Sequence, residues 1–291
     1  MRPFDYVEPE TLDEALDLLA GDPEDTLVMA GGTSLVILMK QDLIRPARVI
    51  GLRRIAPLRV IGALDAIAGT AGVRSLQLGA LATHAALARS PEVRGHAPAL
   101  AATFAAVATV RIREQATIGG NLVHADPAQD PPVTLLALDG VAIARSKARE
   151  RRIPLDALFV DLFETALEPD ELLLRVELPP LPAGARATYR KFLPATYDDY
   201  ATVSVAAVVA TDPAGACTHA RIALGGAGPV PLRALDAERS LLGRRLEGPV
   251  IREAAALAAA ATDPIDDLRG SAEYKRAMAG VWTERALREV A

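Results

Sequence analysis

The spacing of hydrophobic and polar residues along the chain predicts a mixture of helices and strands. Some stretches repeat apolar residues every three or four positions, which is typical of a helix with one buried face. Others alternate apolar and polar residues or form short β-branched runs, which is typical of strands. The helical pattern occurs at residues 11–19, 35–40, 84–89, 97–110, 131–138, 233–242, 250–261 and 272–287. Thr11 stands three positions before Glu14, which predicts a capping box at the first of these helices, and we expect Gly140 to end the helix at residues 131–138. The strand pattern occurs at residues 26–30, 48–52, 141–144, 172–178, 202–210 and 218–224.

Two changes in this pattern divide the chain into three regions. From residue 58 onward, small apolar and polar residues alternate with frequent glycine, as in the strands of a mixed sheet. The run Pro-Pro-Leu-Pro-Ala-Gly at residues 179–184 is the clearest linker in the chain. Beyond it, two predicted strands flank Asp-Pro-Ala-Gly at residues 212–215, which is typical of a hairpin turn. We therefore expect domains at residues 1–57, 58–178 and 179–291.

Two pairs of adjacent glycines interrupt the predicted elements. Gly31 and Gly32 lie between a predicted strand and a predicted helix, whereas Gly119 and Gly120 belong to the stretch ATIGGN at residues 116–121. Glycine permits positive φ and has no Cβ, so successive amide N–H groups of such a turn can point at one anion. Both turns are candidate cradles for a phosphate-bearing ligand, and a tight turn without a ligand is the alternative for each.

Polar residues near the second glycine pair add candidate contacts. Asn121 can both donate and accept hydrogen bonds, and Thr117 supplies a short hydroxyl. Asp130 stands before Pro131, an order that predicts a helix N-cap, and its carboxylate could also accept hydrogen bonds from sugar-like hydroxyls. Lys191 opens the third region and is either a surface lysine or a cation that leans over a bound ligand.

The composition excludes several classes of protein. The chain is 51% hydrophobic but only 4% aromatic, so its core is expected to be mostly aliphatic. A formal charge of −5 without a basic stripe argues against a nucleic-acid partner. Neither a GxGxxG nor a GxxxxGK[ST] nucleotide-binding motif is present. No signal core and no apolar run long enough to span a membrane is present, so we expect a cytoplasmic protein.

The cysteine and the histidines offer little for metal or nucleophilic chemistry. Cys217 is the single cysteine, which excludes a disulfide or a cysteine-ligated cluster within this chain and favours a small buried side chain. The four histidines lack the spacing of metal ligands. We interpret His84, His96 and His219 as structural, whereas His124, inside the second glycine segment, remains open.

Taken together, several stretches resemble the flavin-binding medium subunit of the molybdenum hydroxylases. This family includes aerobic carbon monoxide dehydrogenase and the flavin domain of xanthine dehydrogenase. The matching stretches occur in the family's order and cover nearly the whole chain, although each is weak alone. They are AGGTSL, GALATHAALARSPEV, PALAATFAAVATVRIREQATIGGNL, DPAQDPPVTLLALDG, DELLLRVELP, YRKF, IALGGAGPVPLRA and RGSAEYKRAMAGVWTERAL.

The resemblance implies an α+β fold that binds FAD non-covalently. It implies a two-subdomain FAD-binding region, with a small α/β subdomain and a mixed-sheet subdomain, followed by a C-terminal antiparallel sheet with helices. Both glycine turns would hold the pyrophosphate, Asp130 the ribityl or pyrophosphate region, and Lys191 would lie near the flavin ring. The cofactor-binding residues implied in this way are Val28, Met29, Ala30, Gly31, Gly32, Thr33, Ser34, Leu35, Val107, Thr117, Ile118, Gly119, Gly120, Asn121, Asp130, Leu173 and Lys191.

The resemblance also implies an oxidoreductase whose redox chemistry belongs to its cofactor, so no side chain is expected to be catalytic. Electrons would arrive from a small iron–sulfur subunit and leave to an external acceptor such as NAD, a quinone or oxygen. Molybdopterin and [2Fe-2S] clusters are expected only in the partners, a large molybdopterin subunit and the small iron–sulfur subunit. The alternatives are a stand-alone flavin oxidoreductase of related fold, a non-catalytic nucleotide-binding or scaffold protein, and a subunit that has lost FAD.

The chain departs from the family's pattern at two places. Asp126 stands where the family commonly has serine, and residues 193–197 replace basic residues that often follow the lysine. The contacts of the second stretch, and with them the electron acceptor, therefore stay open.

Overall fold

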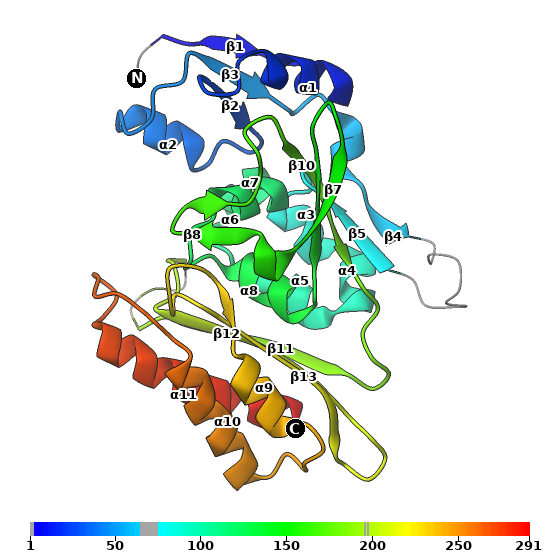
Figure 1. The fold of residues 1–291 in the computed structure, drawn as a ribbon, viewed down its shortest axis with the longest axis vertical. Coiled ribbons are helices and arrows are strands. Elements are labelled where there is room, and N and C mark those ends of the chain that lie inside the picture. Colours follow the sequence, from blue (N-terminus) through cyan, green and yellow to red (C-terminus); the bar gives the residue numbers. More distant parts are fainter. Residues whose placement is uncertain (1–2, 65–74, 195, 197) are drawn as a thin grey trace.

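Three main sheets follow one another along the longest axis of the molecule (Figure 1). The computed structural model describes residues 3–64, 75–194, 196 and 198–291. Part of the stretch predicted as strands of a mixed sheet, residues 65–74, and two positions of the loop at residues 193–197 lie outside the described residues. None of the described helices combines the length and the apolar composition that crossing a membrane requires.

The first sheet is small and parallel. Its strand order is β1 (Asp5–Val7), β3 (Arg48–Gly51) and β2 (Thr26–Met29), joined through helices α1 (Leu12–Gly21) and α2 (Leu35–Lys40). Helix α1 begins with the expected capping box, because the Thr11 hydroxyl accepts from the Glu14 amide at 3.2 Å and the Glu14 carboxylate accepts from the Thr11 amide at 3.3 Å. A 3₁₀ turn at Ala56–Arg59 leads to the next sheet.

The second sheet is antiparallel at each described pairing rather than mixed as we expected, and helices cover one of its faces. Its strand order is β4 (Ile61–Leu64), β5 (Ser75–Gly79), β10 (Leu172–Leu178), β6 (Val141–Arg145) and β7 (Glu150–Pro154). Between β5 and β6 the chain forms α3 (His84–Arg89), α4 (Pro91–His96), α5 (Pro98–Ala106), α6 (Val110–Gln115), α7 (Ile118–His124) and α8 (Asp130–Ala137). A 3₁₀ turn (Leu155–Ala157) and a small hairpin of β8 (Phe159–Asp161) and β9 (Glu164–Thr165) precede β10.

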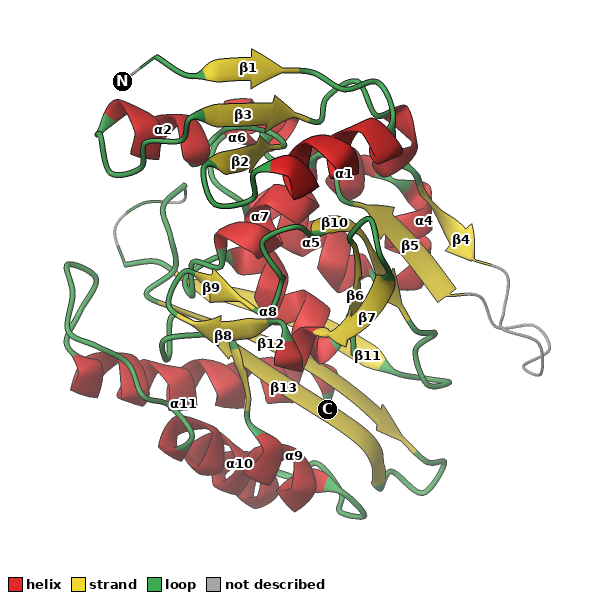
Figure 2. Cartoon of the chain, turned by 45° about the horizontal axis from the view of Figure 1, so that its top comes forward, coloured by secondary structure: helices red, strands yellow, loops and turns green. Residues whose placement is uncertain are grey.

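The third sheet is antiparallel and lies between two hydrophobic cores. It contains β11 (Arg186–Phe192), β12 (Val203–Thr211), β13 (Cys217–Gly225) and β14 (Leu232–Arg233), and helices α9 (Leu235–Leu241), α10 (Gly248–Ala260) and α11 (Ala272–Val290) cover one face (Figure 2). Successive side chains of a strand point to opposite faces. Val205 and Val209 therefore pack with these helices, while Ala206 and Val208 pack with the core that contains α8. This explains why the pattern of β12 is apolar at nearly every position.

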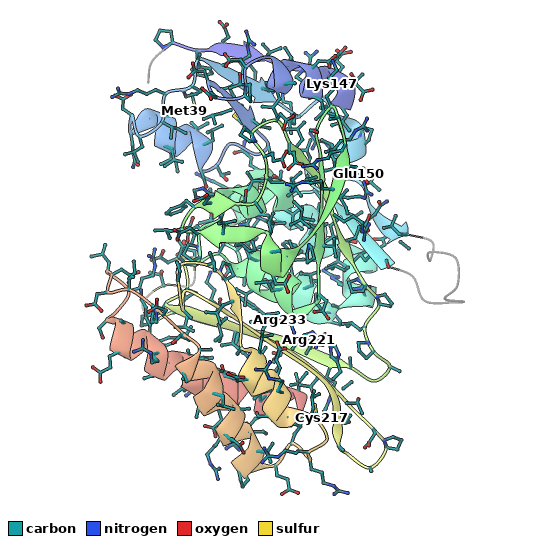
Figure 3. The ribbon with its side chains drawn as sticks, viewed as in Figure 1. Met39, Lys147, Glu150, Cys217, Arg221 and Arg233 are labelled. Atoms are coloured by element: carbon teal, nitrogen blue, oxygen red, sulfur yellow. The ribbon has the colours of Figure 1, made fainter. Side chains whose placement is uncertain are left out.

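Ion pairs also join the third sheet to the C-terminal end of α8. Arg221 and Arg233 lie beside one another at this contact (Figure 3). Asp139 accepts from Arg221 Nε at 2.8 Å and from Arg233 at 3.3 Å. The architecture confirms the α+β fold, with a region of two sheets followed by a region of one sheet covered by helices.

Three predictions about local structure were wrong. The helix predicted at residues 97–110 is two helices, because Ala108 adopts a φ of 38° and the Arg113 guanidinium binds the carbonyl oxygens of Val107 and Ala108. Gly140 does not end the helix predicted at residues 131–138; Asp139, at a φ of 52°, supplies the left-handed residue. The second glycine pair lies in the first turn of α7 rather than in a loop.

Candidate functional site

A cavity of about 440 Å³ lies between the first sheet and the helices of the second sheet. Its walls are β2 and the turn that follows it, helix α7, and the chain from residue 165 to the start of β10. The volume falls within the range of roughly 300–1,000 Å³ that is usual for small-molecule and cofactor sites. The two glycine segments predicted from the sequence therefore face one common space.

The first glycine turn presents free backbone donors to this cavity. Gly32 has a φ of 72°, a conformation that glycine adopts without steric cost. Among the described residues, the amide N–H groups of residues 31–35 have no hydrogen-bond acceptor, and all five residues line the cavity. A concave row of free amides is a suitable site for an anion such as a phosphate.

Gly31 brings the two glycine segments together. A Cβ atom at this position would lie 2.1 Å from the carbonyl oxygen of Gln115 and 3.1 Å from the Cα of Ala116. Only a residue without a side chain allows this approach of two backbones. The first turn is therefore fixed against the chain that leads directly into α7.

We expect the Gly31→Ala variant to lose about 1–3 kcal/mol of the free energy of unfolding. The new methyl group would overlap a backbone carbonyl that cannot rotate away, so the two segments must separate. Urea denaturation of the variant measures this loss. Gly21→Ala is the matched control, because a Cβ at Gly21 meets no atom within 4 Å. Equal stability of Gly31→Ala and the control would contradict the close approach.

The second glycine segment does not offer the free amide groups that the sequence predicted. The amides of residues 118–121 already have acceptors within the protein: those of Ile118 and Gly119 donate to carbonyls of residues 82 and 80, and those of Gly120 and Asn121 donate to Thr117. Thr117 is the N-cap of α7, and its hydroxyl accepts from Gly120 at 3.2 Å. This segment therefore offers a surface without side chains and polar groups of Thr117 and Asn121, rather than a row of free amides.

Several buried polar atoms around the cavity lack a partner. Both ring nitrogens of His84, Oδ1 of Asn121 and Oε1 of Gln129 have no hydrogen bond among the described residues. Each buried polar group without a partner costs about 1–3 kcal/mol. A polar ligand with donors and acceptors, or the water it brings, would satisfy these atoms, so the residues present fit a nucleotide cofactor.

His84 stands at this wall as a neutral ring. It is fully buried, its ring stacks on Phe104 with centroids 5.5 Å apart, and its amide donates to the carbonyl of Ala116 at 3.0 Å. Burial lowers the pKa of His84 to about 4, and the positive charge of Arg113 contributes to the same shift. The imidazole is therefore uncharged at neutral pH. The structure places this histidine at the cavity, a role beyond the structural one that we predicted.

Val107, Asp130 and Lys191 do not line the cavity, and two of them, Asp130 and Lys191, bind each other. Lys191 Nζ lies 2.9 Å from Asp130 Oδ2 and 3.3 Å from the carbonyl oxygen of Ala106, and the Tyr189 hydroxyl donates to Asp130 Oδ1. The side chains of Asp130 and Lys191 are 6% and 7% exposed, so this is a buried ion pair. It joins α8 to β11 at the contact between the central region and the third sheet.

Burial raises the pKa values of Asp130 and Tyr189. It raises the pKa of Asp130 above its ordinary value of 3.8, against the opposing effect of the Lys191 charge. Burial, with the neighbouring Asp130 carboxylate, raises the pKa of Tyr189 well above 10.0. Tyr189 therefore stays a phenol and remains a hydrogen-bond donor.

Asp130 does not cap α8 as the sequence predicted. The helix begins at Asp130 itself, and Gln129 is the N-cap without a side-chain hydrogen bond. The next two residues are prolines, which have no N–H group for a cap to bind. The Asp130 carboxylate instead turns to Lys191 and Tyr189, whose hydrogen bonds to a buried charge are stronger.

Apart from Ile118, the predicted site residues fall into two sets, one that lines the cavity and one that does not. Ile118 is fully buried within the core rather than on the cavity wall. Sequence reasoning missed Gln129, which lines the cavity directly beside Asp130, and the Glu168–Leu172 edge of the wall. A single glutamine before a helix carries no distinguishing signal. The cavity set is Val28, Met29, Ala30, Gly31, Gly32, Thr33, Ser34, Leu35, Thr117, Gly119, Gly120, Asn121 and Leu173.

Cys217 lies away from the cavity, whereas His124 lies on its wall. Cys217 is buried as expected and lies in the third sheet, far from the cavity (Figure 3). His124 lines the cavity, and its ring lies 5.3 Å from that of Phe163. Asp126 accepts from the amide of Ala128 at 2.9 Å and so closes a local turn.

Comparisons with known proteins cover the whole chain. Residues 2–181 match the model of the FAD binding domain in molybdopterin dehydrogenase, and residues 177–290 match the CO dehydrogenase flavoprotein C-terminal domain. The 6-hydroxypseudooxynicotine dehydrogenase complex subunit alpha of Paenarthrobacter nicotinovorans is 36% identical over 99% of this chain and 95% of its own length. The carbon monoxide dehydrogenase medium chain of Afipia carboxidovorans is 36% identical over 98% of this chain and 95% of its own length.

A solved structure shows the same architecture. The chain superposes on one from the carbon monoxide dehydrogenase of Hydrogenophaga pseudoflava with a TM-score of 0.93 and 33% identity, covering 100% of this chain and 98% of the other. The sequence relatives, both family models and the fold all indicate the same family. The chain belongs to the family of FAD-binding oxidoreductase subunits of the molybdopterin dehydrogenases, the molybdenum hydroxylases.

Proposed function

We propose that this chain binds FAD non-covalently in the cavity and transfers electrons within a molybdenum hydroxylase complex. The observation that carries the proposal is the row of free amides at residues 31–35, which faces unpartnered polar atoms of His84, Asn121 and Gln129 across one cavity. An anionic, hydrogen-bonding, partly apolar ligand satisfies all of these groups, and FAD has this chemistry.

Each set of residues would then have a distinct task. The amides of the first turn bind the pyrophosphate, and Asn121 and Thr117 contact the cofactor from the opposite side. Leu173, at the start of β10, supplies an apolar contact. Val107, Asp130 and Lys191 would hold the part of the cofactor next to the cavity wall at Gln129, where Asp130 and Lys191 form a buried ion pair.

The partners follow from this role. Bound FAD can hold two electrons and release them to an external acceptor, for which NAD, a quinone and oxygen are the candidates. A small iron–sulfur subunit would supply the electrons, and a large molybdopterin subunit would oxidise the substrate. We assign the first sheet to a subdomain at residues 1–57, the second to residues 58–178 and the third to a domain at residues 179–291.

Flavin titration tests this proposal. We expect the purified chain, freed of flavin, to bind FAD in an equimolar ratio, with the shifted absorbance of a protein-bound flavin. Acid precipitation should then release all flavin into the supernatant. A chain that binds no FAD would refute the proposal, and flavin that stays in the pellet would instead support a covalent, stand-alone oxidoreductase.

A further inference from the structure

The β8–β9 hairpin carries an exposed apolar tip beside the cavity. Val160, Leu162 and Phe163 are 57%, 46% and 53% exposed, and Val123 on the adjoining helix α7 is 44% exposed. Monomeric proteins rarely expose several large apolar side chains together unless the surface binds a partner. The hairpin lies along the same side of the molecule as α7 (Figures 1 and 2).

Phe163 is held in this position at the cost of local strain. Its φ is 59°, in the left-handed region that bulky side chains rarely occupy. The Phe163 amide donates to the carbonyl of Ala125 at 3.3 Å, and its ring lies against that of His124. The backbone thus presents an aromatic side chain to solvent in a conformation that glycine would adopt more easily, which points to a role for the aromatic ring itself.

The rim of this tip is acidic. Asp161 and Glu164 are paired residues of the two strands, and neither carboxylate forms an ion pair within the described part of the chain. Like charges directly opposite each other destabilise a strand pair. Two unpaired carboxylates around an apolar tip therefore suit a partner with complementary basic groups, and they disfavour a symmetric contact with a second copy of the same surface.

The tip is continuous with the mouth of the cavity. Val123, His124 and Thr165 belong both to the neighbourhood of the hairpin and to the cavity lining. A protein that covers the hairpin therefore comes to lie directly beside the bound cofactor. Of the two partner subunits in the proposed complex, the iron–sulfur subunit donates electrons to the cofactor and must therefore lie close to it.

From these observations, and resting on the proposed function, we propose that the hairpin tip formed by Val123, Val160, Leu162 and Phe163 is the docking surface for the iron–sulfur subunit. Phe163 is the central anchor of this contact, because exposed aromatic side chains contribute strongly to association. Asp161 and Glu164 guide a basic rim of the partner toward it.

Two variants and one control test this proposal on the FAD-loaded chain. The probe is the iron–sulfur subunit of the same complex, purified with its clusters, and its affinity is measured by titration. Phe163→Gly should weaken association by at least about tenfold, and Leu162→Ser should weaken it as well. Leu235→Ser is the matched control, because Leu235 is similarly exposed, at 50%, and belongs to α9, which covers the third sheet.

The measurements separate docking from folding and from FAD binding. Phe163→Gly relieves the strained backbone, so its thermal stability should not fall and its FAD content should equal that of the wild type. Unchanged affinity of both variants for the iron–sulfur subunit would overturn the proposal. The proposal would also be overturned if the wild-type chain formed dimers, or bound anionic lipid vesicles, and Phe163→Gly abolished that association. Absence of FAD from the wild-type chain would instead contradict the proposed function.

Discussion

The Lys191→Met variant is expected to lose about 3–5 kcal/mol of the free energy of unfolding, because it leaves a buried carboxylate without its cation. Asp130 and Lys191 are almost fully buried and 2.9 Å apart, so water cannot replace the missing charge. Methionine matches lysine in length, and the loss of packing is therefore small. Urea denaturation of the FAD-free proteins measures the difference without a contribution from ligand binding.

The loss of unfolding free energy in Lys191→Met should grow as pH rises. Burial already raises the pKa of Asp130 above 3.8, and removing Lys191 removes the charge that opposes this shift. The folded variant therefore keeps a proton over a range of pH in which the unfolded chain has lost it. In that range the free energy of unfolding falls as pH rises. The variant's penalty should be complete above the raised pKa and should shrink as pH falls toward 3.8.

Two further variants decide whether the buried pair is responsible. Arg190→Met removes the neighbouring cation of the same strand, whose ion pair with Glu289 is about half exposed, and should cost less than about 1 kcal/mol. The double variant with Asp130→Asn and Lys191→Met should recover much of the loss, since no buried charge remains. A Lys191→Met variant as stable as Arg190→Met would show that the pair does not hold α8 to β11.

Burial patterns within single elements could be predicted from the sequence, whereas contacts between distant elements could not. The capping box of α1 and the apolar strand β12 depend on neighbouring residues, and both were predicted. The second glycine segment was predicted as a turn because adjacent glycines permit positive φ, and glycine also weakens helices. Packing against Ala80 and the cap from Thr117 override that preference and make it a helix.

In the candidate site, too, single residues could be predicted from the sequence, but the contacts between distant residues could not. Asp130 and Lys191 could each be named from the sequence, but their ion pair spans 61 positions, and no local spacing encodes it. His84 follows a helix cap, which made a structural interpretation natural, and only the fold places its unpartnered ring at the cavity. Only the resemblance to a family identified FAD as the expected cofactor, because neither composition nor periodicity could do so.

The Gly120→Val variant is expected to bind FAD at least about a hundredfold more weakly than the wild type, equivalent to about 2.7 kcal/mol. A Cβ at this position would lie 3.1 Å from the Thr117 hydroxyl and 3.5 Å from the Cβ of Ala30, in the narrow space between the two glycine segments. The two methyl groups of valine would extend into the cavity, where we place the pyrophosphate. Fluorescence titration with FAD measures the affinity.

The same substitution should leave the fold intact, because residue 120 is helical and valine is a better helix former than glycine. Gly95→Val is the matched control: Gly95 lies in α4, and a Cβ there meets no atom within 4 Å. Equal thermal stability of both variants, with FAD binding lost only in Gly120→Val, would locate the cofactor between the two segments. Full flavin occupancy of Gly120→Val would place it elsewhere, because no phosphate and valine side chain can share that space.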